Sequence, residues 1–184
     1  MGFKSAGTAF REVPEYDGGS FRTETTMTIQ IGDRLPAATF AVLRDGVKPL
    51  TTDDIFKGRK VVLFAVPGAF TPTCSERHLP GYVEHYEDFR KHGIDVACMA
   101  VNDAFVMQAW ARHRNVPEGM LMLADGNGDF AKALGLDSDA SKYGMGVRSK
   151  RFALYADDGL VKVLHVEAPG EFRVSSAEAM LAAI

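Results

Sequence analysis

The sequence contains only two cysteines, Cys74 and Cys98, in 184 residues. Two cysteines cannot form a disulfide framework in a domain of this size, and neither belongs to a CxxC pair or to a Cys/His cluster with zinc-like spacing. We therefore expect no metal, no other cofactor, and free thiols in a reducing compartment. Such thiols are either buried in the core or used in chemistry.

Long apolar runs and an excess of one charge are also missing from the sequence. No stretch approaches the roughly 18 consecutive apolar residues of a membrane span, and the N-terminus lacks the basic start and apolar run of a secretory signal. The formal net charge is −3, and the basic residues are scattered rather than clustered. We therefore expect a cytoplasmic protein with neither nucleic acid nor a membrane as its partner.

The chain divides into a short extension and one domain. Residues 1–26 mix Gly, Ser, Thr and charged residues without periodicity, so we predict an N-terminal extension outside the main fold. Residues 27–184 are long enough for a single hydrophobic core, and we predict one domain there. A transit peptide is disfavoured because such peptides are poor in acidic residues, whereas the extension contains Glu12, Glu15, Asp17 and Glu24.

Short β-branched runs alternate with amphipathic stretches from Pro36 onward, which is the pattern expected when helices cover a sheet. The runs at 60–66 and 94–101 are almost continuously apolar, so we place both strands centrally with both faces covered. This alternation predicts an α/β fold. The complete set of expected strands is 39–43, 60–66, 94–101, 120–125, 151–156 and 160–166.

Local signals also predict helices and a turn. Tyr82, Tyr86 and Phe89 recur at helical spacing and predict one surface helix, which Pro80 should kink or restart near its first turns. Further helices should follow the capping residues Asn102 or Asp103 and Ser175 or Ser176. Residues 157–159 predict a tight hairpin turn between the last two strands.

Cys74 follows a turn rich in proline, glycine and threonine. If the preceding strand ends at Val66 and a helix begins near Thr73, residues 67–72 lie at the carboxyl end of a central strand, where open α/β sheets place their sites. Unpaired N–H groups and the helix dipole in the first turn favour a thiolate. Core packing is the ordinary role of a free cysteine, but the stiff turn and the nearby Thr71 hydroxyl favour a reactive one.

The residues around Cys74 resemble the active-site signature of the peroxiredoxins, specifically of the type II subgroup. The resemblance implies a thioredoxin-like fold, with a central mixed β-sheet flanked by helices on both faces, and thiol peroxidase activity. It covers nearly all of residues 27–184. The matching runs are PGAFTPTC (67–74), HLPG (78–81), AVNDAFVMQAW (100–110), LMLADGNGDF (121–130), KALGL (132–136), GVRSKRFALYADDG (146–159) and GEFRVSSAEAML (170–181).

By position, the resemblance implies roles for five residues. Cys74 corresponds to the peroxidatic cysteine, whose thiolate attacks one peroxide oxygen and becomes a sulfenic acid. Thr71 and the backbone N–H groups of Thr73 and Cys74 would hold the peroxide oxygens. Arg151 would stabilise the thiolate and the charge on the leaving oxygen, and Pro67 would shield the pocket.

Arg148 and His78 also lie close in sequence to these five residues. Arg148 lies close to Arg151 in the sequence, and only the position of the Arg-Phe pair that opens the 151–156 strand favours Arg151. His78 lies one helical turn beyond Cys74. A thiolate that its surroundings already ionise needs no general base, so we expect a structural role for His78 or a place in the pocket wall.

A second thiol must resolve the sulfenic acid. Cys98 lies in an expected central strand, where a core position is the plain interpretation, yet plant members of the subgroup carry a candidate resolving cysteine at the matching place. Other members use a cysteine near the C-terminus, where Ser175 or Ser176 stands here. The remaining routes are a Cys74–Cys98 disulfide after local unfolding, glutathionylation, and an external dithiol protein. We favour glutathione with glutaredoxin, and thioredoxin second.

Other functions and partners follow from the same residues. Dithiol exchange is excluded, because Arg77 occupies the position of the second cysteine in a CxxC motif. A redox sensor, in which oxidation of Cys74 signals without efficient turnover, is the alternative function. The family also implies a homodimer packed near the active-site loops, and the loop around Phe70 offers apolar surface for that contact.

Overall fold

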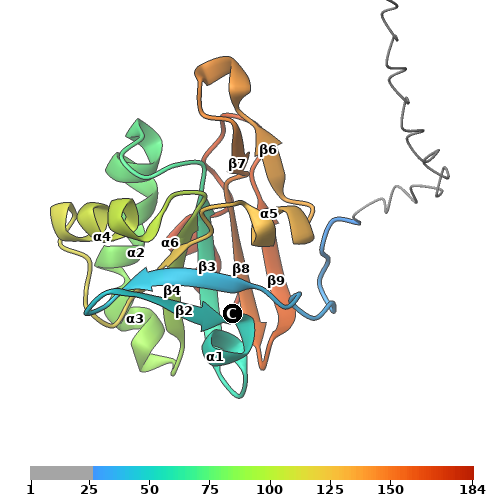
Figure 1. The fold of residues 1–184 in the computed structure, drawn as a ribbon. Coiled ribbons are helices and arrows are strands. Elements are labelled where there is room, and N and C mark those ends of the chain that lie inside the picture. The colour runs from blue at the N-terminus through green and yellow to red at the C-terminus, as the bar shows by residue number, and fades with distance from the viewer. Residues whose placement is uncertain (1–26) are drawn as a thin grey trace, which may run out of the picture.

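The computed structural model describes residues 27–184 (Figure 1), so the predicted extension at 1–26 lies outside the described residues. Within the described part, a seven-stranded mixed sheet has the order β2-β1-β5-β4-β3-β8-β9, and β6 and β7 form a separate pair. The strands are β1 (Thr39–Leu43), β2 (Val47–Thr51), β3 (Lys60–Val66), β4 (Asp95–Ala100), β5 (Leu121–Ala124), β6 (Asp137–Asp139), β7 (Val147–Ser149), β8 (Phe152–Asp157) and β9 (Leu160–Val166).

Helices cover both faces of this sheet, which confirms the predicted α/β architecture. Helices α2, α3, α4 and α6 pack on one face, and α1 and α5 pack on the other. No helix of residues 27–184 is long and apolar enough to cross a membrane. The helical elements are α1 (Thr52–Phe56), the π-helical turn η1 (Cys74–His78), α2 (Leu79–Glu84), α3 (Tyr86–Lys91), α4 (Ala104–His113), α5 (Asp129–Ala133), the short 3₁₀ turn η2 (Ser141–Tyr143) and α6 (Ala177–Leu181).

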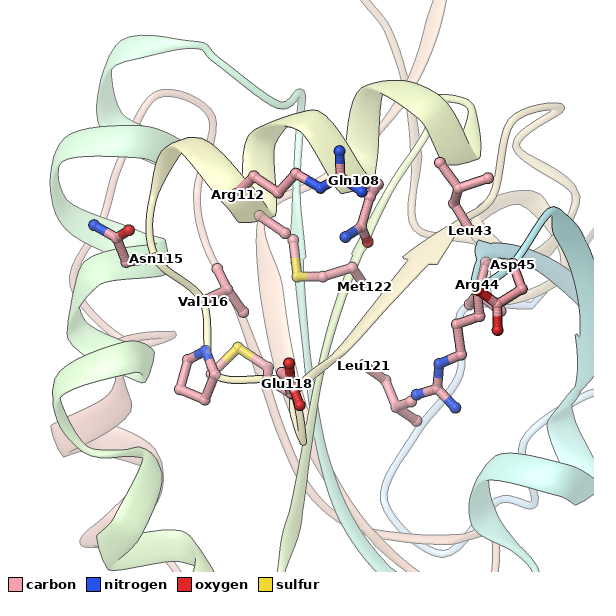
Figure 2. Close-up of a pocket in the computed structure, with 14 residues that line it drawn as sticks. Leu43, Arg44, Asp45, Gln108, Arg112, Asn115, Val116, Glu118, Leu121 and Met122 are labelled. Carbon is pink, nitrogen blue, oxygen red and sulfur yellow. The ribbon is translucent and has the colours of Figure 1, made fainter.

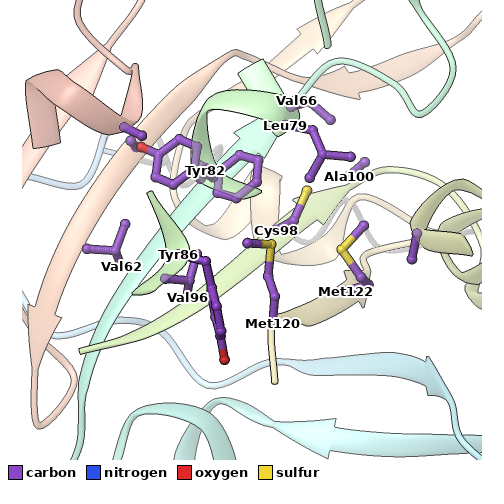
Figure 3. Close-up of a cluster of buried hydrophobic side chains, with 14 of the residues drawn as sticks. Val62, Val66, Leu79, Tyr82, Tyr86, Val96, Cys98, Ala100, Met120 and Met122 are labelled. Atoms are coloured by element: carbon purple, nitrogen blue, oxygen red, sulfur yellow. The ribbon is translucent and has the colours of Figure 1, made fainter. Parts of the chain in front are cut away.

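The strands β3 and β4 lie at the centre of the sheet, as their apolar sequences predicted. β3 pairs in parallel with β4 and antiparallel with β8, and residues 61–66 are completely buried. Successive side chains of a strand point to opposite faces. Val62 and Phe64 therefore enter the core beneath α2, part of which Figure 3 shows, while Val61 and Leu63 enter the core beneath α1 and α5.

The helical segment after β3 differs from the single helix that the sequence predicted. Helical backbone begins at Pro72, widens into η1, continues as α2 and is interrupted at His85 before α3. Pro80 lies at the start of α2 and lacks the N–H that a regular turn would use, so the wide π turn precedes it. The predicted apolar stripe is nevertheless buried along this segment.

Three short strands were not predicted. β2 is an edge strand that contains Pro49 and is mostly exposed, so it has neither the apolar run nor the alternation that marks a strand. β6 and β7 are three residues each and largely polar. Their pairing comes from tertiary contacts, which a local sequence pattern does not report.

The predicted caps and turn are confirmed. The side chain of Asp103 accepts a hydrogen bond from the Val106 N–H at the start of α4, and Ser176 caps α6 in the same way. Asp158 and Gly159 both have positive φ angles, 49° and 73°, as a tight hairpin turn requires.

Candidate active site

The turn between β3 and η1 is held by its own hydrogen bonds. The Thr71 hydroxyl donates to the Gly68 carbonyl oxygen at 2.8 Å, and the Thr71 carbonyl accepts from the Ser75 N–H at 3.0 Å. Phe70 adopts a left-handed conformation with φ 62°, which bends the chain sharply before the helix begins. These constraints place Cys74 in the first helical turn, as the sequence predicted.

Cys74 and Arg151 meet at one edge of the sheet. Because β8 runs antiparallel to β3 with Phe152 opposite Ala65, the residue before β8 lies beside the turn that follows β3. The Arg151 guanidinium places Nη2 at 3.4 Å from the Cys74 sulfur, and Cys74 as a whole is 1% exposed. The contact brings the positive charge of Arg151 to the Cys74 sulfur.

The structure separates the two candidate arginines. Arg148 is engaged with the backbone, since its Nε donates to the Met145 carbonyl and its Nη1 donates to the Val101 carbonyl, both at 2.9 Å. Arg151 is the arginine whose guanidinium contacts the Cys74 sulfur. Arg148 instead packs against the turn. Its Nη1 lies 3.4 Å from the position that a Cβ atom would occupy if Gly68 carried a side chain.

His78 binds the other terminal nitrogen of the Arg151 guanidinium. The His78 Nδ1 lies 3.0 Å from Arg151 Nη1, and Nε2 lies 2.9 Å from the Ser175 carbonyl oxygen. Burial, together with the Arg151 charge, lowers the pKa of His78 to about 3, so the ring is neutral near pH 7. Nδ1 therefore accepts from Arg151, and the proton resides on Nε2, which donates to Ser175.

Thr73 and Pro67 lie beside Cys74 and Arg151, together with a cavity. Thr73 is half-buried in the first helical turn directly before Cys74. Pro67 and Arg151 line a cavity of about 560 Å³, whose wall also includes Tyr143 and Met145. The residues predicted to bind and reduce the peroxide thus lie at one end of the sheet, and the cavity beside them is lined by Pro67 and Arg151 but not by Cys74.

A larger hollow of about 900 Å³ lies elsewhere, between the β1–β2 turn, α4 and β5. Figure 2 shows Gln108 and Arg112 of α4 near Met122, with Arg44 approaching from the turn. Its described lining includes none of the predicted site residues. Size therefore does not identify the candidate site, which is defined by the thiol and guanidinium contact.

Cys98 lies in the middle of β4, opposite Phe64 on β3 and Met122 on β5, and is fully buried. Figure 3 shows it in the core cluster beneath α2. Burial raises the pKa of the Cys98 thiol well above its ordinary value, and the nearby Cys74 adds to the rise. In this fold Cys98 is therefore a protonated core thiol.

Two supporting residues escaped the sequence analysis. The Asn102 side chain, expected as a helix cap, accepts a hydrogen bond from the Ala69 N–H at 3.0 Å and so braces the turn. The indole N–H of Trp110 donates to the buried Ser75 hydroxyl at 3.0 Å. Trp110 looked like an ordinary core residue of an amphipathic helix.

Within residues 27–184, no three His, Cys, Asp or Glu side chains gather closely enough to hold a metal ion.

Comparison with known proteins adds a family to this geometry. The Redoxin family model matches residues 30–181. Peroxiredoxin-2E, chloroplastic, from Arabidopsis thaliana is 48% identical over 168 residues, which are 88% of this chain and 72% of that protein. Peroxiredoxin-2B from the same plant is 43% identical over 159 residues, 85% of this chain and 98% of that protein. The chain belongs to the peroxiredoxin family.

A solved structure supports the same conclusion. Reduced Prx3 from Vibrio vulnificus, in complex with H2O2, is 50% identical with a TM-score of 0.81, and the match covers 85% of this chain and 99% of that one. The fold of this peroxiredoxin is therefore thioredoxin-like, and its subgroup is type II, as the resemblance implied. Peroxiredoxins are thiol peroxidases, so the chain is an oxidoreductase.

Proposed function

We propose that this peroxiredoxin reduces hydrogen peroxide and alkyl hydroperoxides through a sulfenic acid at Cys74. The single observation that carries the proposal is the Arg151 guanidinium at 3.4 Å from a buried sulfur in the first turn of a helix. A guanidinium beside a buried thiol stabilises the anion that attacks a peroxide.

The reaction follows from the positions of the donors. The Cys74 thiolate attacks the terminal oxygen of ROOH, the S–O bond forms as the O–O bond breaks, and the leaving RO⁻ takes a proton from solvent. The sulfur is oxidised to sulfenic acid, and the peroxide is reduced to water or an alcohol. Arg151 stabilises the negative charge that develops on the leaving oxygen.

Thr71 receives a defined role in this step. Its hydroxyl hydrogen is directed to the Gly68 carbonyl, which leaves the oxygen lone pairs as acceptors for the O–H of the peroxide. As the family resemblance implies, the backbone N–H groups of Thr73 and Cys74 would donate to the peroxide oxygens. Pro67 lines the cavity beside Arg151, and, as the resemblance implies, it would shield the reacting sulfur.

Recycling of Cys74 by glutathione with glutaredoxin completes the proposal. Cys98 is fully buried and its thiol stays protonated, which makes it a poor nucleophile without local opening of the fold. In this proposal an external thiol therefore resolves the sulfenic acid instead. Thioredoxin is the second reductant to test.

Two variants test this function. Cys74→Ser should abolish peroxide consumption, and Cys98→Ser should retain most of it with glutathione and glutaredoxin as reductants. Peroxide consumption in a coupled assay is the measurement. Activity in Cys74→Ser would contradict the role of Cys74, and a folded but inactive Cys98→Ser would contradict the reductant. A single oxidation without turnover would favour a redox sensor.

We also propose a cytoplasmic homodimer. Phe70 is 52% exposed at the tip of the active-site turn, and its ring centroid lies 5.8 Å from that of His113 on α4. An exposed aromatic ring beside a reactive site is suited to burial by a second copy of the chain. Microscopy of the tagged full chain tests the location.

A further inference from the structure

The carboxylate of Glu167 holds the segment that follows β9. Glu167 is 7% exposed, and one of its oxygens, Oε1, collects every hydrogen bond that the side chain accepts from this segment. A charged acceptor shared by several donors fixes a loop more firmly than neutral hydrogen bonds do. The donors are the N–H groups of Arg173 at 2.7 Å, Val174 at 2.8 Å and Ser175 at 2.8 Å, and the Ser175 hydroxyl at 2.9 Å.

This arrangement aims the Ser175 carbonyl into the protein. Ser175 is completely buried, and its carbonyl oxygen accepts from His78 Nε2 at 2.9 Å and from the Tyr82 hydroxyl at 3.0 Å. The two donors come from η1 and α2, so one carbonyl joins the C-terminal segment to the helix that carries Cys74. The orientation of the His78 ring therefore depends on the position of Ser175.

His78 transmits this orientation to Arg151. Its neutral ring offers Nδ1 to Arg151 Nη1 at 3.0 Å, and the same guanidinium presents Nη2 to the Cys74 sulfur at 3.4 Å. A guanidinium is planar, so a bond that fixes one nitrogen also fixes the direction of the other. A continuous series of contacts thus leads from the Glu167 carboxylate to the sulfur.

The same segment packs an aromatic ring against the series. The ring centroid of Phe172 lies 5.0 Å from that of His78, and the Arg151 guanidinium carbon lies 5.8 Å from the Phe172 ring. Release of the segment would remove this ring as well as the Ser175 carbonyl. Arg151 would then lose both its positioning bond and its apolar support.

We propose that Glu167 is a positioning residue of the peroxidase: it fixes the 172–175 segment and, through the Ser175 carbonyl and His78, aims Arg151 at the Cys74 sulfur. The inference rests on the proposed role of Cys74. Glu167 itself contacts neither the sulfur nor the peroxide. Burial raises the pKa of Glu167, but the hydrogen bonds from Ser175, Arg173 and Val174 outweigh it and lower the pKa, so the carboxylate is ionised.

The test measures the first oxidation of Cys74 in the full chain without any reductant. Stopped-flow mixing with hydrogen peroxide, followed by Trp110 fluorescence or by peroxide loss, gives the second-order rate constant. Glu167→Ala should lower it at least about tenfold, because small displacements of a catalytic group are costly. Glu167→Gln should recover most of the rate, since its amide oxygen still accepts N–H bonds. Equal loss in both variants would overturn the positioning role.

A double variant tests the route through His78. If Glu167 acts through that ring, Glu167→Ala should have little further effect in a His78→Ala background, and the double variant should be as slow as the slower single variant. Losses that multiply would show that Glu167 does not act through His78 and would overturn the proposed route. If Glu167→Ala does not fold, Glu167→Asp replaces it, with an expected loss of about threefold or more.

Asp125 supplies a matched control. It too is a buried carboxylate that accepts backbone N–H bonds, from Phe130 and Ala131 at the start of α5, on the other face of the sheet. Asp125→Ala should lose stability but keep its oxidation rate within about twofold, since Arg151 stays in place. A loss equal to that of Glu167→Ala would overturn the proposal. Cys74→Ser keeps the two failures distinguishable: oxidation in that variant would contradict the proposed function, whereas a Cys74-dependent rate that Glu167→Ala leaves unchanged would contradict only the positioning role of Glu167.

Discussion

At the scale of single residues, the candidate site depends on which arginine contacts the Cys74 sulfur. Arg148 and Arg151 are close in sequence, and both lie near the turn that carries Cys74. Their hydrogen bonds differ, because Arg148 holds two backbone carbonyls while Arg151 joins His78 to the sulfur. The guanidinium fork of Arg151 thus makes two contacts that the single ammonium of a lysine cannot reproduce with the same geometry.

Substitution of each arginine by lysine separates these roles. Arg151→Lys should lower the rate constant of Cys74 oxidation by about a hundredfold, as the loss of an electrostatic donor at a reacting group typically does. Arg148 binds backbone carbonyls rather than the sulfur, and Arg148→Lys retains its positive charge. This substitution should therefore change the rate by less than about threefold. Stopped-flow oxidation by hydrogen peroxide is the measurement. A larger loss in Arg148→Lys than in Arg151→Lys would contradict the assignment.

At the scale of elements, His78 joins parts of the chain that are distant in sequence. His78 is the last residue of η1. It binds Arg151, which directly precedes β8, and its ring is oriented by Ser175 in the segment before α6. The sequence placed His78 one turn beyond Cys74 but could not show that His78 binds Arg151 and Ser175. Periodicity identifies the buried face of a helix, whereas partners from other elements depend on how the sheet and the C-terminal segment pack.

The neutral, buried state of His78 predicts a pH dependence of stability. The pKa of His78 is lowered from 6.5 to about 3 by burial and by the Arg151 charge. Between these values the unfolded chain binds a proton at His78 and the folded chain does not, so this residue makes stability fall as pH falls below 6.5. Above 6.5 both states are neutral and the contribution disappears.

The variant His78→Gln removes this titration while keeping an amide that can donate to Ser175. Between pH 7 and pH 5, the wild-type chain should lose about 2 kcal/mol more of its free energy of unfolding than the variant does. Urea unfolding at the two pH values measures the difference, and other titrating groups largely cancel in the comparison. Parallel losses in the two proteins would mean that His78 is protonated in the folded state.

The break between α2 and α3 and the short strands mark the limit of local prediction. The stripe of Tyr82, Tyr86 and Phe89 indicated the buried face correctly, and Pro80 indicated an irregularity near the first turns, but the interruption at His85 was not predicted. β2, β6 and β7 are exposed or very short, so the hydrophobic pattern that reveals a central strand is missing from them.

At the scale of the whole molecule, aromatic rings are exposed at the active-site turn and on α4. Phe70 at the turn and Phe105 at the start of α4 are 52% and 63% exposed. The rigid turn that presents Phe70 is the same turn that places Cys74. Burial of Phe70 by a second copy would therefore also support the active-site turn from outside.

The dimer proposed above is tested by charge at this position. Phe70→Asp should convert a dimer into a monomer, because a carboxylate buried at an apolar interface without a partner is strongly unfavourable. Analytical ultracentrifugation of the variant and of the wild-type chain measures the mass. Glu76→Gln, an exposed change on η1, is the control and should leave the mass unchanged. A monomeric wild-type chain would contradict the proposal.

The sequence by itself determined the α/β class, the buried central strands, the family and the position of Cys74 at the start of a helix, because these depend on local composition, periodicity and a contiguous motif. The tertiary structure decided which arginine contacts the sulfur, the tautomer of His78 and the link from Glu167 through Ser175. These features join residues from β8, η1 and the segment after β9. Such contacts depend on strand register and on the packing of side chains, which no local pattern encodes.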